Sequence, residues 1–124
     1  MINAKEKKEL DFEISFYGGI LHNDPGYIEA LTLLGGAYSR RGFYLKGLQV
    51  DLKLCRFRPR DPVAYYNLAC SYSLLGNIDS ALGSLEKTIQ LGYRDLKWMN
   101  NDPDLANVRK DKRYNNLKGK VSPS

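Results

Sequence analysis

The chain has few of the residues on which redox and metal chemistry depend. Among its 124 residues are two cysteines, one histidine and one tryptophan. Cys55 and Cys70 lie 15 positions apart on different predicted helices, so they do not build the disulfide framework of a small secreted domain. A zinc site with one histidine would need an unusual ligand set. We therefore expect no disulfide framework, no metal and no cofactor, and this cysteine usage favours a cytoplasmic location.

Long apolar runs and catalytic motifs are also missing. No stretch approaches the roughly 18 consecutive apolar residues of a membrane-spanning helix, so we expect no membrane span. Met1–Lys8 reaches charged residues without an apolar stretch, and we expect no signal peptide there. The chain has no HExxH or CxxC motif, no phosphate-binding glycine loop and no Ser-His-Asp set. These absences predict that the protein is not an enzyme.

What the chain does have is an internal repeat. Six residues recur at an interval of 34 positions: Pro25 and Pro59, Ala30 and Ala64, Leu34 and Leu68, Tyr38 and Tyr72, Gly42 and Gly76, Leu48 and Leu82. Self-similarity at a fixed period is typical of stacked supersecondary units. The sequence therefore predicts two units, residues 28–61 and 62–95.

Hydrophobic spacing predicts that each unit is a pair of helices. Leu31, Leu34 and Tyr38 recur every three or four residues, which draws one apolar stripe along a helix. A second such stripe follows Gly42, and the same pattern surrounds Gly76 in the second unit. Asp61 is a candidate helix N-cap before Pro62, which suits a first helical turn. The pattern predicts an all-α fold.

Small residues locate the close contact within each pair. Gly35 and Ala69 share one position of the repeat, and Gly47 and Ala81 share another. Closely packed helices leave no room for large side chains at such positions. We therefore expect tight packing there, and an alanine at Gly47 to be neutral or stabilising.

These residues resemble the tetratricopeptide repeat (TPR) family. The first unit matches the family pattern at Leu31, Leu34, Gly35, Tyr38, Gly42, Gly47 and Pro59; the second matches at Tyr65, Leu68, Ala69, Tyr72, Gly76 and Ala81. Asp51, Tyr93 and Glu13 depart from it. The resemblance covers roughly residues 9–117 and implies a right-handed α-solenoid of antiparallel helix pairs, with about two full repeats.

The resemblance also assigns the ends of the chain. It implies one domain over residues 1–117, with an N-terminal helix like a half repeat in 1–25 and a C-terminal helical cap in 96–117. Trp98, Leu105, Val108 and Tyr114 would fold back over the last helix pair and seal its edge. Residues 118–124 are expected to form a disordered tail.

The family implies binding of a protein or peptide without catalysis. In such arrays the first helix of each pair lines a concave groove. By register its residues would be Glu29, Thr32, Leu33, Gly36, Ser39, Arg40, Tyr66, Asn67, Cys70 and Ser73. Some relatives clamp a peptide carboxylate there; Asn67 matches the middle asparagine of that clamp, but Thr32 and Gly36 stand where its lysine and asparagine belong. Cys70 is expected to be a small buried filler.

Charge is the second indication of a partner. The net charge is +5 and the isoelectric point is near 9.2, which would attract acidic proteins or peptides. Beyond Arg40, a basic strip within residues 40–60 consists of Arg41, Lys46, Lys53, Arg56, Arg58 and Arg60. An RNA-binding adaptor that uses this strip is a further, less favoured interpretation.

Self-association is the main alternative function. An array with two full units leaves apolar surface at its ends, and Leu10, Phe12, Phe16 and Tyr17 could cover one end by pairing with a second copy. The sequence thus leaves open a homodimer that serves as a scaffold.

Overall fold

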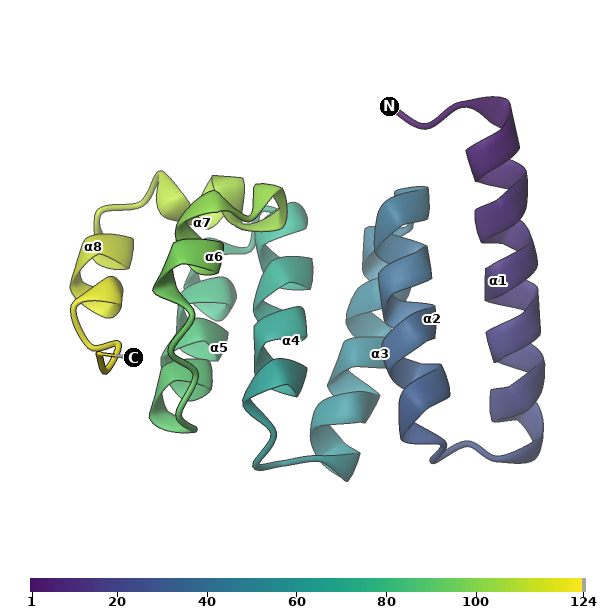
Figure 1. The fold of residues 1–124 in the computed structure, drawn as a ribbon, viewed down its shortest axis with the longest axis horizontal. Helices are drawn as coiled ribbons and strands as arrows, with labels where there is room; N and C mark the ends of the chain where they lie inside the picture. The colour runs from purple at the N-terminus through teal and green to yellow at the C-terminus, as the bar shows by residue number, and fades with distance from the viewer. Residues whose placement is uncertain (124) are drawn as a thin grey trace.

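The computed structural model describes residues 1–123 as an all-α chain. Its elements, in chain order, are α1 (Ala4–Asn23), α2 (Ile28–Arg41), α3 (Tyr44–Phe57), α4 (Pro62–Leu74), α5 (Ile78–Gln90), α6 (Leu96–Asn101), the 3-10 helix η1 (Pro103–Leu105), α7 (Ala106–Arg109) and α8 (Arg113–Lys118). The helices follow one another from α1 at one end of the molecule to α8 at the other (Figure 1). None of the described helices is both long enough and apolar enough to cross a membrane.

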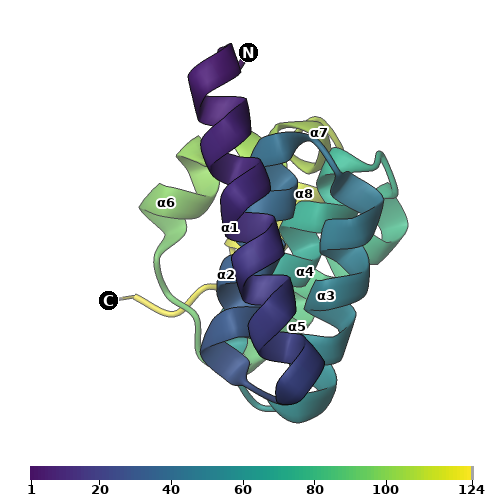
Figure 2. The ribbon, with the colours of Figure 1, turned by 90° about the vertical axis from the view of Figure 1, so that its right-hand side faces the viewer.

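The helices pack in adjacent pairs. In the structure α2 packs on α3 and α4 on α5, while α1 covers α2 and α3 contacts α4. Figure 2, seen from the N-terminal end, shows α1 lying across α2. The first helices of the two pairs begin at Ile28 and Pro62, and the second helices begin at Tyr44 and Ile78. Both starts recur at the interval of the sequence repeat, so the structure confirms the two expected helix pairs.

Local signals end and begin the helices where the sequence predicts. Gly42 and Gly76 have φ values of 86° and 76°, a left-handed conformation that glycine adopts without steric cost. Asp61 is the N-cap of α4, and its Oδ1 accepts a hydrogen bond from the Val63 amide over 2.9 Å. Asn3 caps α1 in the same way through the Glu6 amide. These local features set where the helices begin and end.

The close approach of α2 and α3 depends on two glycines. A Cβ atom on Gly35 would lie 2.7 Å from Oδ1 of Asp51, closer than real contacts allow. A Cβ atom on Gly47 would lie 3.4 Å from the Ser39 hydroxyl oxygen, an ordinary contact distance. The two helices therefore meet at small residues, as the repeat predicts, but only Gly35 has no room for a methyl group.

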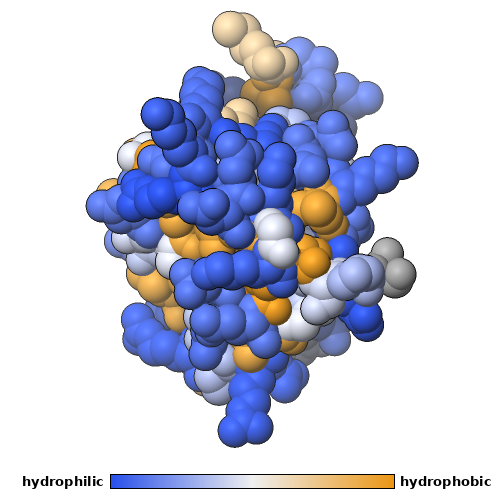
Figure 3. Space-filling model, turned by 90° about the vertical axis from the view of Figure 1, so that its left-hand side faces the viewer, coloured by the Kyte–Doolittle hydropathy of each residue, from blue (hydrophilic) through white to orange (hydrophobic). Residues whose placement is uncertain are grey.

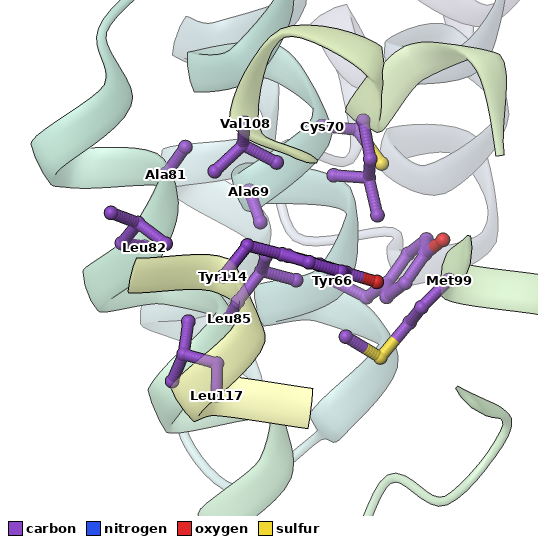
Figure 4. Packing of buried hydrophobic residues seen from close by; sticks show 11 residues of the cluster. Tyr66, Ala69, Cys70, Ala81, Leu82, Leu85, Met99, Val108, Tyr114 and Leu117 are labelled. Carbon is purple, nitrogen blue, oxygen red and sulfur yellow. The ribbon is translucent and has the colours of Figure 1, made fainter. Parts of the chain in front are cut away.

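Two apolar clusters form the core. The first lies between α2, α3 and α4 and is joined by Ile14, Tyr17 and Leu21 of α1. The second joins α4 and α5 to the C-terminal segment (Figure 4). Within it Leu85, Met99, Leu105 and Val108 are fully buried. Leu105, Val108 and Tyr114 thus fold back over the last helix pair as expected.

Trp98 does not help to seal that pair, so this part of the prediction is wrong. Its side chain is 51% exposed, whereas the next residue, Met99, is fully buried in the second cluster. Asp95 caps α6 by accepting a hydrogen bond from the Trp98 amide. The helix that begins there turns Met99 inward, and the neighbouring Trp98 is therefore left outside the core.

Beyond α8, the structure describes the chain as far as residue 123. Val121 packs against the second cluster, and the Lys120 amide donates to the Leu117 carbonyl over 2.9 Å. Residue 124 lies outside the described residues. The disorder expected for residues 118–124 stays a prediction.

Candidate binding groove

A hollow of about 390 Å³ opens between the two helix pairs, on the side of the molecule where α6 and η1 lie. It is lined by residues of α2, α4 and the C-terminal segment, with one residue of α3 at its base. The lining residues are Thr32, Gly35, Gly36, Ser39, Arg40, Asp51, Tyr66, Asn67, Cys70, Trp98, Asp102 and Asp104. We call this hollow the groove.

Seven of the ten residues predicted from the repeat register line the groove, and three do not. Glu29 and Leu33 are exposed on α2 but are outside the lining. Ser73 is fully buried, so its assignment is wrong. Its hydroxyl accepts a hydrogen bond from the Val108 amide over 3.2 Å, and its carbonyl accepts one from Asn107 over 2.9 Å. The packing of α7 on α4 therefore covers the position that the register assigned to the groove.

Tyr66 forms part of the floor of the groove and is only 6% exposed. Its hydroxyl donates a hydrogen bond to Oδ2 of Asp102 over 2.6 Å, and its ring stacks on that of Tyr93 at 4.9 Å between centroids. Burial, and then this bond to Asp102, raise the pKa of Tyr66 well above its usual range. Tyr66 therefore lines the groove as the register predicts, but its ring packs on Tyr93 and its hydroxyl is bound to Asp102.

Asp102 reaches this floor from 36 residues further along the chain. Its Oδ1 accepts a hydrogen bond from the Asp104 amide over 3.0 Å, so Asp102 is the N-cap of η1. The thiol of Cys70 lies 3.8 Å from Oδ2. Burial, and then the charge of Asp102, raise the pKa of Asp104. The C-terminal segment thus adds two carboxylates that the register did not place in the groove.

Asp51 supplies a third carboxylate, from α3. It is 4% exposed, and its Oδ2 accepts a hydrogen bond from the Ser71 hydroxyl over 2.6 Å. Burial raises the pKa of Asp51 to about 6, and the bond from Ser71 only partly opposes this. The sequence carried a signal for this residue, because Asp51 departs from the repeat pattern at a position where an aromatic residue or leucine is expected.

Polar and open positions surround these carboxylates. The half-buried Asn67 lines the groove, and its side-chain amide has no hydrogen-bond partner within residues 1–123. Gly36 leaves the backbone of α2 open, since an added Cβ would meet nothing within 4 Å. Arg40 also lines the groove, but its guanidinium lies 3.3 Å from Glu13 of α1. The groove can therefore offer both hydrogen bonds and backbone to a ligand.

Cys70 is buried, as expected of a small filler residue. Burial, and then the negative charges of Asp102, Asp104 and Asp51, raise the pKa of its thiol. A protonated thiol is a poor nucleophile and a poor metal ligand. Among the described residues, no group of three or more His, Cys, Asp or Glu side chains has an arrangement that could hold a metal ion.

The residues of the basic strip have different surroundings. Arg41 binds Asp11 of α1 over 2.8 Å and lies over the ring of Phe43. Lys46 and Lys53 line a second hollow, between α1 and α3. A third hollow, at the turn between α3 and α4, is lined by Arg58 and Arg60, and Arg56 is exposed on α3.

Comparison with known proteins adds one partial relative. No family model matches the chain. The chain is similar to a chloroplastic protein of Arabidopsis thaliana, with 35% identity over 86 residues. The match covers 67% of this chain and 26% of that protein, so the chain spans about a quarter of the length of this curated relative.

Proposed function

We propose that the chain is a TPR-like module that holds an extended peptide or protein segment in the groove, without catalysis. The helix starts that recur at the interval of the sequence repeat and the succession of adjacent helix pairs support a right-handed solenoid of the TPR kind. Such a solenoid presents a curved surface suited to holding another molecule.

One observation carries this proposal. Residues assigned to the groove by the repeat register come together in one hollow, although they lie on α2 and α4. The hollow combines open backbone at Gly36 with the side-chain amide of Asn67, which has no partner within the described chain. An extended peptide offers the complementary donors and acceptors along its backbone.

The test is a selection from a phage-displayed library of random dodecapeptides on the immobilised protein. Gly36→Trp should place an indole in the groove, and its Cβ has room because an atom at this position meets nothing within 4 Å. Gly83→Trp is the matched control, since Gly83 is equally open but lies on α5, away from the groove. We expect selected peptides to lose binding to Gly36→Trp and to keep it with Gly83→Trp. Equal binding to both variants would refute the groove as the binding site.

A homo-oligomerising scaffold is the second candidate, favoured by the outer face of α1. Phe12 and Phe16 are 70% and 54% exposed, and their rings stack 6.2 Å apart. The opposite end, covered by α8, is mainly hydrophilic, with apolar patches between the polar side chains (Figure 3). Light scattering after size exclusion at two concentrations tests this function. A mass near 14.1 kDa at both concentrations would exclude a stable dimer.

The other expectations are proposals of lower rank. Nucleic-acid binding is less favoured because Arg41 of the basic strip is paired with Asp11 of α1 and lies over the ring of Phe43. For the location, the cytoplasm stays our proposal, and the chloroplast in the name of the relative is the compartment to test against it.

A further inference from the structure

The charge of the groove is opposite to the charge of the whole chain. The protein carries a net charge of +5, yet the carboxylates of Asp51, Asp102 and Asp104 line the groove. Arg40 is the one basic residue in the described lining, and it lies beside Glu13 of α1. Because charges further apart than about 8 Å are largely screened at physiological salt, these local carboxylates decide which charge the groove accepts.

Asp51 has one oxygen that is fixed and one that is available. Oδ2 is held by the Ser71 hydroxyl, whereas Oδ1 accepts no hydrogen bond from any residue in 1–123. Fully buried side-chain oxygens and nitrogens of the described residues all have partners. Oδ1 therefore keeps contact with the groove that Asp51 lines, although the residue is 4% exposed. A carboxylate oxygen that has no donor, in a side chain that is otherwise buried, is a site for a cationic donor.

An aromatic wall stands beside these carboxylates. The half-exposed Trp98 lines the groove, and its indole is the best of the side chains that bind a cation over a ring face. Asp104 is half-buried, and its carboxylate accepts no hydrogen bond within residues 1–123. Lysine and arginine have the chemistry to use both features, because each joins a charged donor to an apolar stem.

We propose that the groove binds a basic peptide segment, with a lysine or arginine side chain placed between Asp51, Asp104 and Trp98. This inference rests on the proposed function and specifies its partner. It replaces the acidic partner that the net charge predicts. The carboxylates serve the side chain of a peptide rather than a metal ion, since the described residues contain no arrangement that could hold one.

The experiment uses peptides selected from the random library on the full chain. The strongest binder is synthesised with a fluorescent label, and each lysine or arginine is replaced in turn by norleucine, which keeps the apolar stem and removes the charge. Affinities are measured by fluorescence anisotropy for the wild type, Asp51→Asn and Asp104→Asn. Asp79→Asn is the matched control, because Asp79 is an exposed carboxylate on α5, outside the groove.

We expect one basic position of the peptide to lose roughly 10-fold in affinity on replacement by norleucine, as for a charge-assisted hydrogen bond. Asp51→Asn or Asp104→Asn should lower the affinity for the basic peptide by a similar factor. The affinity for the norleucine peptide should not change in these variants. Asp79→Asn should bind like the wild type.

The contrary results separate the two proposals. Some selected peptides could lose binding to Gly36→Trp although their affinity does not depend on their basic residues. That result would overturn the proposed basic partner, but the groove would remain the binding site. Selected peptides that bind Gly36→Trp as well as the wild type would overturn the proposed function, and this inference with it.

Discussion

The Ser71 hydroxyl of α4 donates a hydrogen bond to the Asp51 carboxylate of α3 over 2.6 Å. This bond joins the two helix pairs, since α3 ends the first pair and α4 begins the second. The other oxygen of Asp51 is the closest atom to the position that a Cβ on Gly35 of α2 would occupy. One carboxylate of α3 therefore bonds α4 and lies close to α2 at the base of the groove.

Asp51→Asn should stabilise the protein at neutral pH. In the folded chain the pKa of Asp51 is raised from 3.8 to about 6, mainly by burial. The folded state therefore holds this proton more tightly, and the resulting stability is present below pH 3.8 and lost as the pH rises through about 6. The loss corresponds to about 3 kcal/mol. Urea denaturation between pH 4 and 8 should show the free energies of unfolding of the two proteins diverging as the pH rises. Parallel curves would contradict the burial of this charge.

Alanine at Gly35 and alanine at Gly47 should have opposite effects. Gly35→Ala forces its Cβ against Asp51, and we expect a loss of about 1 to 3 kcal/mol in the free energy of unfolding. Gly47→Ala meets only ordinary contacts and gains helix propensity, so we expect up to about 1 kcal/mol of stabilisation. Both values can be measured by thermal and urea unfolding. A stable Gly35→Ala protein would show that α2 and α3 do not approach so closely.

Tyr66→Phe should lower stability by about 1 to 3 kcal/mol. The variant removes the hydroxyl that donates to Asp102 and leaves a buried carboxylate without its strongest donor. Tyr65→Phe is the control, because the hydroxyl of Tyr65 forms no hydrogen bond within the described chain. Equal urea midpoints for the two variants would argue against the Tyr66–Asp102 bond.

Met99→Ala and Trp98→Ala should differ, although the residues are neighbours. Met99 is fully buried, so its truncation should cost about 2 to 5 kcal/mol. Trp98 is half-exposed outside the core, and we expect its truncation to cost less than about 1 kcal/mol. If Trp98→Ala were the more destabilising change, Trp98 would be the capping residue that the sequence predicts.

Replacement of Phe12 and Phe16 by serine should barely change the stability of a monomer. Both side chains are exposed, so we expect a change within about 0.5 kcal/mol. Unfolding of the double variant and of the wild type at two protein concentrations checks this. A large loss that depends on concentration would show that a second copy covers this face of α1.

The helices and their ends follow from the sequence because they depend on near neighbours. Apolar spacing, the cap Asp61 and the glycines at positions 42 and 76 act within one or two turns, and the structure has each where it was expected. The period of the repeat extends this local information to two similar pairs, and it also locates most of the groove lining.

The contents of the groove required the tertiary structure. Trp98, Asp102 and Asp104 follow α5 in the chain, and no periodicity indicates that they return beside Tyr66 and Cys70. The same packing places α7 over Ser73, and it buries Met99 in the core.

By itself, then, the sequence determined the helix pairs, their register and the positive charge of the whole chain. Only the tertiary structure decided the acidic character of the groove. Periodicity reports which face of a helix is buried, whereas the charge of a cavity depends on side chains that folding brings together from distant segments.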